Sequence, residues 1–123
     1  MLNYTRTFSS FSVNDLGKAK AFYEQVLGIP VKETPQGLSL FDNSIFVYPK
    51  SNHEPATFTV LNLQVADIDA AVDQLTAQGV RFLHYEGEMG TDAKGIARDP
   101  RGPQIAWFKD PAGNILSVLE GSM

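Results

Sequence analysis

The chain has 123 residues, of which 43% are hydrophobic and 20% are charged, so it is long enough to form one globular domain with its own core. It has no cysteine, which excludes disulfides, thiolate metal sites and a cysteine nucleophile. The net charge of −4 and the lack of a Lys/Arg cluster argue against nucleic-acid binding, and no apolar run is long enough for a signal peptide or a membrane span, so we expect a cytoplasmic protein with no membrane partner.

Two segments with the same pattern begin the two halves of the chain. Each starts with an alternating run, residues 8–13 and 60–65, that is typical of a strand with two different faces. An aspartate then precedes an apolar stripe at helical spacing, which predicts a helix capped by Asp15 in the first half and by Asp67 in the second. Four pairs keep an offset of 52 residues, namely Val13 and Val65, Asp15 and Asp67, Leu16 and Ile68, and Ala19 and Ala71.

Each helix is followed by a glycine and then by three strand-like runs. Gly28 and Gly79 stand where a left-handed helix C-cap favours glycine. Asp110-Pro-Ala-Gly113 is typical of a tight hairpin turn, and the long irregular stretch 86–101 is predicted to be a loop. We expect the strands near residues 30–33, 38–41 and 45–48 in the first half and near 81–85, 104–109 and 115–119 in the second.

The pattern as a whole predicts an α+β fold of two tandem βαβββ modules. The modules cover about residues 5–49 and 56–120, with a linker at about 49–55, and together they should form a single domain. In each module we expect the helix to cover one face of the sheet and to leave the other face open.

The segments FSVNDLGKAKAFYEQVLGIPV, LNLQVADIDAAVDQLTAQGV and IAWFKDPAGNILSVLE resemble the vicinal oxygen chelate superfamily, to which glyoxalase I, bleomycin-binding proteins and extradiol dioxygenases belong. The repeat, the V-x-D-x-x-x-A helix starts and the D-P-x-G-N hairpin carry this resemblance over nearly the whole chain. The resemblance implies that the two modules form a U-shaped cleft, in which family enzymes bind a divalent metal through His, Gln or Glu from four strands. One fold carries many activities, so the resemblance does not name a reaction.

The positions that match the family's metal ligands carry other residue types in this chain. The resemblance places these positions at Phe8, Val60, Ser117 and within residues 46–49. Phenylalanine and valine cannot coordinate a cation, neutral serine is a poor ligand, and residues 46–49 contain no carboxylate or imidazole. We therefore expect no family metal site and no cofactor.

The side chains expected to face the cleft are aromatic, apolar or uncharged and polar, which suits the capture of a small organic ligand. Apolar walls would supply burial, and amide or hydroxyl groups would orient the ligand. The same side chains could instead simply fill the cleft. The predicted ligand-binding residues are Phe8, Ser10, Ser12, Tyr48, Val60, Asn62, Gln64, Trp107 and Ser117.

Some titratable side chains could serve general acid/base chemistry, although solvated surface charges are the more common role for such residues. The candidates are Glu86, Glu88, Asp92 and Asp99 in the loop, together with His84. His84 is expected to be partly buried on a strand, and His53 to lie on the surface of the linker. A metal role for the two histidines would require a geometry that the sequence does not indicate.

Three functions stay open at this point. The favoured one is a glyoxalase/bleomycin-resistance-like protein that binds a small organic molecule without the family metal. The alternative is a lyase, isomerase or dioxygenase that uses a metal at a displaced site, so whether the chain is an enzyme is undecided. A non-catalytic interaction subunit is the third, and because exposed sheet edges favour assembly, we expect a homodimer.

Overall fold

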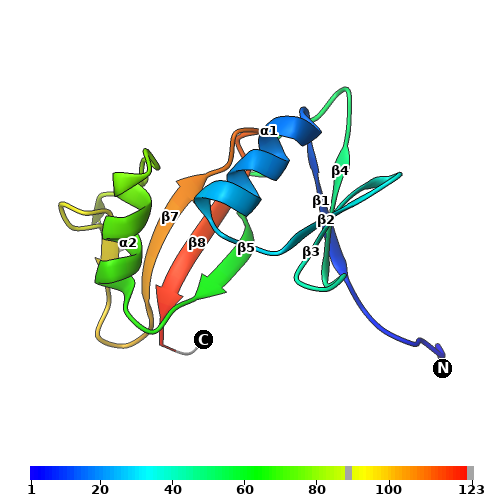
Figure 1. The fold of residues 1–123 in the computed structure, drawn as a ribbon. Coiled ribbons are helices and arrows are strands. Elements are labelled where there is room, and N and C mark those ends of the chain that lie inside the picture. The colour runs from blue at the N-terminus through cyan, green and yellow to red at the C-terminus, as the bar shows by residue number, and fades with distance from the viewer. Residues whose placement is uncertain (88–89, 122–123) are drawn as a thin grey trace. The chain divides into compact units, whose positions relative to one another are not determined.

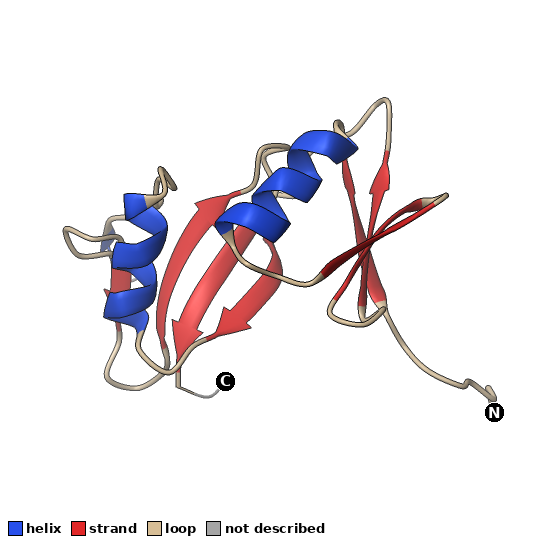
Figure 2. Cartoon of the chain, in the orientation of Figure 1, coloured by secondary structure: helices blue, strands red, loops and turns tan. Residues whose placement is uncertain are grey.

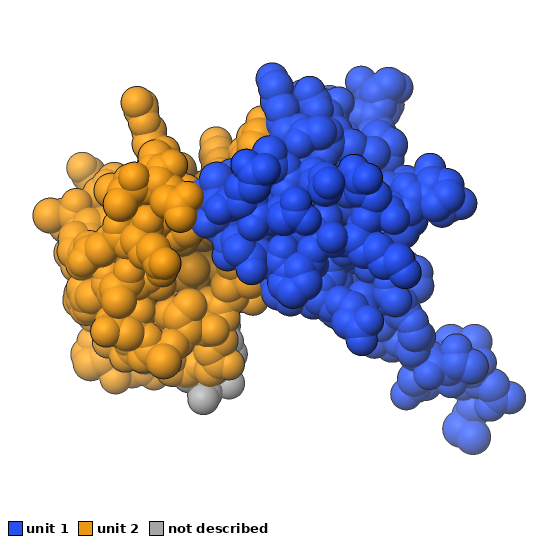
Figure 3. All heavy atoms as spheres, viewed as in Figure 1, with its two compact units in different colours: residues 1–55 blue, residues 56–123 orange. Residues whose placement is uncertain are grey.

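The computed structural model describes residues 1–87 and 90–121. The chain divides into two compact units, Met1–Pro55 and Ala56–Met123, called unit 1 and unit 2 here (Figure 3). Each unit contains one four-stranded sheet and a helix (Figures 1 and 2), as the tandem βαβββ pattern predicts. A single domain built from both units stays a prediction. None of the helices in the described part of the chain has the length and apolar character needed to cross a membrane.

Unit 1 forms a mixed sheet in the order β1-β4-β3-β2. Strand β1 pairs in parallel with β4, and the β2–β3 and β3–β4 pairs are antiparallel. The elements are β1 Ser9–Val13, α1 Leu16–Ala21, the π-helical turn η1 Phe22–Val26, β2 Val31–Thr34, β3 Gly37–Leu40 and β4 Ile45–Pro49.

The helix of unit 1 begins where the sequence predicts. The Asp15 carboxylate accepts a hydrogen bond from the Lys18 amide at 3.0 Å, which satisfies a donor that the first turn leaves unpaired. The helix then widens into η1, where the Leu27 amide donates to the Phe22 carbonyl. Tyr23 in this turn is fully buried, and its ring lies 6.1 Å from that of Phe11 on β1, so the helix covers the face of the sheet that carries Phe11.

Unit 2 repeats the topology, with the sheet order β5-β8-β7-β6. Here β5 pairs in parallel with β8, and the β7–β8 and β6–β7 pairs are antiparallel. The elements are β5 Thr59–Gln64, α2 Ile68–Ala77, β6 Ile96–Arg98, β7 Gln104–Lys109 and β8 Ile115–Glu120.

Helix α2 packs on β7 and β8 (Figure 1), and its buried residues are Ile68, Val72 and Leu75. Asp67 caps it by accepting from the Ala70 amide at 3.1 Å, and the Glu120 side chain accepts from the Ile68 amide at 3.0 Å. The second bond fixes the side of β8 that faces α2, because Glu120, Val118 and Leu116 alternate onto one face. The opposite face of this sheet carries Ser117.

The expected strand at residues 81–85 is wrong, and part of the expected loop 86–101 is a strand. Phe82 makes only an isolated bridge, to Phe108, whereas residues 96–98 form β6 along Gln104–Ala106. The outer edge of β7 is therefore shared: one end pairs with β6 and the other with Phe82. The run at residues 81–85 is strand-like in composition, but β6 already occupies the outer edge of β7 at Gln104–Ala106.

The hairpin turn between β7 and β8 is confirmed. Asp110 is buried, and its Oδ1 accepts hydrogen bonds from the Ala112 and Asn114 amides, both at 2.9 Å. Its Oδ2 accepts from Asn114 Nδ2 at 3.0 Å. Gly113 has φ 86°, a left-handed conformation that favours glycine. The two helix ends also behave as predicted, since Gly28 and Gly79 have φ 70° and 93°.

Candidate ligand-binding site

The open face of the unit 1 sheet is rich in aromatic rings. The register pairs Ser10 with Phe46 and Ser12 with Tyr48, so these four side chains lie on the face opposite Phe11. The Phe46 and Tyr48 rings stack with centroids 6.2 Å apart and planes at 15°. The structure thus brings three of the predicted residues, Ser10, Ser12 and Tyr48, onto one surface.

A cavity of about 330 Å³ lies on this face of unit 1, beside Phe8 and Phe46. Phe8 precedes β1 and is 59% exposed, and the Arg6 guanidinium carbon lies 4.9 Å from the centre of its ring. Arg6 Nη2 also donates to the Asn43 carbonyl at 2.6 Å. These contacts hold the segment before β1 against the β3–β4 turn. Sequence reasoning did not single out Arg6, because a lone basic residue near the N-terminus carries no pattern.

His53 differs from its expected role as a surface residue. It is half-buried, and its Nδ1 lies 2.7 Å from Ser12 Oγ. The pairing results from the turn after β4, in which the His53 amide donates to the Lys50 carbonyl at 3.1 Å. Ser12 therefore already holds a hydrogen-bond partner within unit 1. The two residues are 41 positions apart, a distance at which no local signal could have linked them.

The open face of the unit 2 sheet carries a row of three predicted residues. Asn62 on β5 pairs with Ser117 on β8, and Ser117 pairs with Trp107 on β7. Cross-strand partners point to the same face, so Asn62, Ser117 and Trp107 form one row across three adjacent strands, called the polar–aromatic row here. The Tyr85 ring packs at 89° against Trp107, with centroids 5.4 Å apart, and braces the indole.

Two polar side chains on this face make hydrogen bonds within unit 2. Ser117 Oγ, fully buried, donates to Asn62 Oδ1 at 2.6 Å. Gln64 Nε2 donates to the Gly121 carbonyl at 2.5 Å. Val60 is half-buried and lies at a register shift between Thr59 and Leu61, where β5 bulges against β8. The ligand role predicted for these residues stays a prediction, although the structure groups them on one surface.

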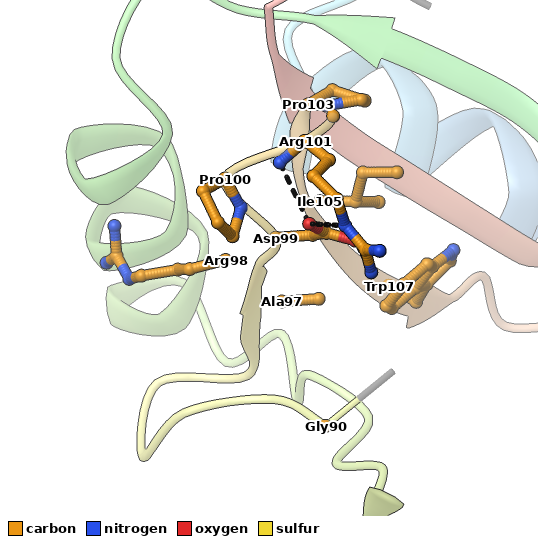
Figure 4. Close-up of a pocket in the computed structure, with 10 residues that line it drawn as sticks. Gly90, Ala97, Arg98, Asp99, Pro100, Arg101, Pro103, Ile105 and Trp107 are labelled. Atoms are coloured by element: carbon orange, nitrogen blue, oxygen red, sulfur yellow. Dashed lines mark hydrogen bonds and ion pairs between the residues drawn. The ribbon is translucent and has the colours of Figure 1, made fainter. Parts of the chain in front are cut away.

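A cavity of about 520 Å³ lies beside Trp107, at the β6–β7 hairpin and its loop (Figure 4). Ala97, Ile105 and Trp107 form its apolar wall, because Ala97 pairs with Ile105 on the same face as Trp107. A volume of this size is in the range that small organic ligands occupy in proteins. Ala97 and Ile105 were missed: alternation from Trp107 could have indicated Ile105, but Ala97 lies on the strand that the sequence did not predict.

An ion pair borders this cavity. Asp99 Oδ1 accepts from the Arg101 amide at 2.9 Å and from Arg101 Nε at 3.2 Å (Figure 4). The Arg101 main-chain amide, and then its guanidinium, hold the pKa of Asp99 below its ordinary value. Figure 4 shows the Arg98 side chain extending away from Trp107, toward α2. Asp99 is therefore an ionised wall residue already engaged with Arg101, which does not suit it as a general base.

Asp92, another acid/base candidate, also lacks a suitable arrangement. Asp92 Oδ1 accepts from the Lys94 and Ile96 amides, both at 2.9 Å, and Asp92 Oδ2 accepts from Arg98 Nε at 2.9 Å. Partial burial acts to raise the pKa of Asp92, but hydrogen bonds from Arg98, Ile96 and Lys94 outweigh it and lower the pKa. Asp92 thus shapes the turn into β6.

The remaining acid/base candidates are His84, Glu86 and Glu88, and the structure describes the first two. His84 is exposed and outside any strand, so the expectation of a partly buried strand residue is wrong. The two residues before it contact β7, because Phe82 bridges to Phe108 and the Leu83 amide donates to the Trp107 carbonyl at 2.8 Å. Glu86 is exposed, and Glu88 lies outside the described residues.

The parallel strand pairs show which residue of unit 1 corresponds to Ser117, one of the positions that the resemblance assigns to a metal ligand. Ser10 and Asn62 are 52 positions apart, as the repeat requires, and they pair with Phe46 and Ser117 respectively. Phe46 is therefore the unit 1 equivalent of Ser117, within the range 46–49 that the resemblance indicated. With Phe8 and Val60 at the other two positions, the donor set does not fit a divalent metal. Across residues 1–87 and 90–121, no three His, Cys, Asp or Glu side chains cluster as a metal site would require.

Comparisons with known proteins agree with the topology. Residues 3–118 match the family model described as Glyoxalase/Bleomycin resistance protein/Dioxygenase superfamily. The fold is similar to that of the fosfomycin resistance protein FosX from Listeria monocytogenes, with a TM-score of 0.72 and 13% identity over 99% of this chain and 94% of that one.

Two further solved structures show the same fold. Lactoylglutathione lyase from Agrobacterium tumefaciens has a TM-score of 0.68 and 20% identity over 96% of this chain and 95% of its own. The antibiotic binding protein TnmS3 from Streptomyces sp. CB03234 has a TM-score of 0.66 and 23% identity over 99% of this chain and 100% of its own. At these identities the likeness concerns the fold alone.

Proposed function

Because the chain belongs to the glyoxalase/bleomycin resistance protein/dioxygenase superfamily, and its open sheet faces carry aromatic and uncharged polar groups, we propose that it binds a small aromatic molecule without a metal ion. The observation that carries this proposal is the cavity of about 520 Å³ walled by Ala97, Ile105 and Trp107 in unit 2. Aromatic side chains supply large apolar contact area and favour stacking with planar ligands.

Trp107 is suited to this role by its surroundings. It is half-buried, its indole is held by Tyr85, and β7 is bonded along one edge to β8 and along the other to β6. A rigid aromatic platform loses little conformational entropy on binding, so stacking on it contributes more to affinity than stacking on a mobile ring.

The donor set supports binding without a metal. A metal-dependent lyase, isomerase or dioxygenase would need about three His, Asp or Glu ligands around an open coordination position. Phe8, Phe46, Val60 and Ser117 supply none of these side chains. The solved structure of TnmS3 is described as that of an antibiotic binding protein, which is consistent with this kind of role.

Ligand binding can be tested with the Trp107→Leu variant. A library of aromatic metabolites and drugs is screened by thermal shift, and the affinity of each hit is measured by calorimetry for the native chain and the variant. We expect Trp107→Leu to weaken binding at least about ten-fold because the stacking surface is lost. Tyr4→Leu, which removes an exposed ring in the N-terminal segment, serves as the control and should bind normally. A broad screen without a stabilising compound would contradict the proposal.

Metal independence is measured separately. Binding of a hit should be the same before and after dialysis against EDTA, and elemental analysis should find no stoichiometric transition metal in the purified protein. Nickel, zinc, iron or manganese at one ion per chain after dialysis would favour the metal-dependent alternative instead.

A cytoplasmic homodimer stays part of the proposal. Strands β1 and β2 are the edges of the unit 1 sheet, and β5 and β6 are the edges of the unit 2 sheet. Unpaired strand edges expose main-chain groups that a second copy can pair with. Sedimentation at micromolar concentration should give twice the 13.5 kDa chain mass, and a species of 13.5 kDa would refute the dimer.

A further inference from the structure

We propose that Asn62 selects ligands that carry a hydrogen-bond acceptor, so that the ligand class is uncharged planar aromatic carbonyl compounds. This inference rests on the proposed function and sharpens it, because it assigns a polar recognition role to one end of the polar–aromatic row.

The amide of Asn62 is oriented by the strand beneath it. Ser117 Oγ is fully buried and donates to Asn62 Oδ1 at 2.6 Å, which occupies the acceptor side of the amide. The Asn62 side chain is exposed, and among the described residues no partner is found for its Nδ2 donors. An exposed amide with a fixed oxygen therefore presents its N–H groups on the open face.

The row sets the spacing between the donor and the aromatic platform. Asn62, Ser117 and Trp107 lie on three adjacent strands, so Asn62 and Trp107 are two strand spacings, about 10 Å, apart. The residue between them is a serine, which places no bulky side chain in the way. A ligand of two or three fused rings is long enough to stack on Trp107 and to bring an acceptor oxygen to Asn62.

The row also determines the charge of the ligand. Asn62, Ser117 and Trp107 are uncharged, and Asp99 and Arg101 beside the cavity neutralise each other at 3.2 Å. A charged ligand would lose hydration without gaining an opposite charge in this row, whereas a carbonyl oxygen needs only the amide donor. The carbonyl is consequently recognised through hydrogen bonding, and the rings through stacking.

A matched pair of compounds tests the donor directly. 9-Fluorenone and fluorene have the same three rings and differ by the carbonyl oxygen. Binding is followed through the emission of Trp107, the single tryptophan of the chain, so the signal reports on this site. We expect native protein to prefer fluorenone by about five-fold, the usual effect of one hydrogen bond.

Variants then assign the preference to the row. Asn62→Asp keeps the shape and removes both donors, so the two compounds should bind with equal affinity. Ser117→Ala releases the amide to rotate and should leave a preference of about two-fold. Asn3→Asp makes the same chemical change at an exposed site in the N-terminal segment and should keep the full preference. Circular dichroism of each variant checks that it is folded.

The outcomes separate this inference from the proposed function. If both compounds bind the native chain equally, or if Asn62→Asp keeps the preference, the donor role of Asn62 is wrong while aromatic binding at Trp107 stands. If neither compound binds, the proposed function itself is contradicted by these probes and the donor role falls with it. In a ¹⁵N-resolved spectrum, the Asn62 side-chain amide should shift with fluorenone more than with fluorene.

Discussion

The two units carry the same row of positions with different chemistry. In unit 1 the row is Ser10, Phe46 and Ser39, and the register makes these residues the equivalents of Asn62, Ser117 and Trp107 in unit 2. The aromatic side chain of the row is therefore on the second strand, β4, in unit 1 and on the third strand, β7, in unit 2. A bulky ring at the second position covers the sheet, whereas the serine of unit 2 leaves the amide and the indole on either side of it accessible. Equivalent backbones thus provide two different surfaces.

The turns that lead into the last strand of each unit also differ. In unit 2, the buried Asp110 bonds the turn together and Gly113 takes the left-handed conformation. In unit 1, Phe41, Asp42 and Asn43 all have positive φ, between 51° and 70°, and none is a glycine. Such conformations cost free energy in residues with a Cβ. The connection in unit 1 therefore holds three non-glycine residues in a strained conformation, whereas in unit 2 the left-handed position is a glycine.

The largest expected effect comes from a position where the two units differ in side-chain size. Gly37 of unit 1 corresponds to Ile105 of unit 2. A Cβ at Gly37 would overlap the Val47 carbonyl oxygen. Gly37→Ala should lower the free energy of unfolding by about 3 kcal/mol because the β3–β4 backbones must separate. Urea unfolding followed by circular dichroism measures the loss. Gly79→Ala, with φ 93° but open space around it, should lose only about 1 kcal/mol, and an equal loss in both would disprove the clash.

The bonded turn of unit 2 gives the second largest expected effect. Asp110→Ala removes the acceptor of the Ala112 and Asn114 amides and of Asn114 Nδ2. Loss of these three hydrogen bonds from the turn should lower the free energy of unfolding by about 2 kcal/mol. The emission of Trp107 on the neighbouring β7 follows this unfolding. Asp110→Asn retains one acceptor oxygen, so its stability should lie between that of the native chain and that of Asp110→Ala. If Asp110→Ala is as stable as the native chain, these hydrogen bonds contribute little.

The strained turn of unit 1 offers a stabilising change. Asp42 is exposed with φ 55°, a conformation that glycine adopts without strain. Asp42→Gly should raise the free energy of unfolding by about 0.5 kcal/mol, since the relief of strain exceeds the added flexibility of the unfolded chain. Asp42→Ala keeps the strain and is the matched control. Thermal unfolding distinguishes them, and an Asp42→Gly variant that melts below Asp42→Ala would contradict this account.

The smallest expected effect concerns the charge network that joins α2 to β6 in unit 2. Arg98 contacts Asp69 at 2.7 Å and Asp92 at 2.9 Å, and Lys94 contacts Asp69 at 3.1 Å and Asp73 at 2.8 Å. Hydrogen bonds from Arg98, and then from Lys94, lower the pKa of Asp69 below its ordinary value of 3.8. A carboxyl whose pKa is lower in the folded state stabilises the fold above its unfolded pKa, and this contribution is lost as the pH falls through the folded value.

Arg98→Met tests this network through its pH dependence. The variant should unfold slightly more easily than the native chain at pH 7, and the difference should shrink as the pH falls below about 4. Hydrogen exchange should locate the change in α2 and β6, leaving unit 1 unaffected, where Lys20 and Glu33 form an exposed pair at 3.6 Å. A difference that grows toward acid pH would reverse the assigned sign.

Most of the candidate surface could be deduced from alternation along strands. Period-two spacing places Asn62 and Gln64 on one face of β5, and Trp107 follows from the same rule on β7. The contact of Ser117 with Asn62 needs the register between two strands, which sequence spacing within either strand does not contain. The bond between Ser12 and His53 and the cavity beside Trp107 likewise depend on chain segments that meet only after folding.

The sequence by itself determined the features that rest on neighbouring residues: the caps at Asp15 and Asp67, the glycines that end the helices, the hairpin at Asp110 and the doubled βαβββ order. Tertiary structure decided what depends on competition between distant segments. Residues 81–85 and 96–98 both lie along the outer edge of β7. Residues 96–98 pair with β7 over three residues and form β6, whereas Phe82 makes a single bridge to Phe108. Caps and turns are local bonds that a short peptide already specifies, whereas an edge can be shared in several ways, and the packing of the whole sheet selects one of them.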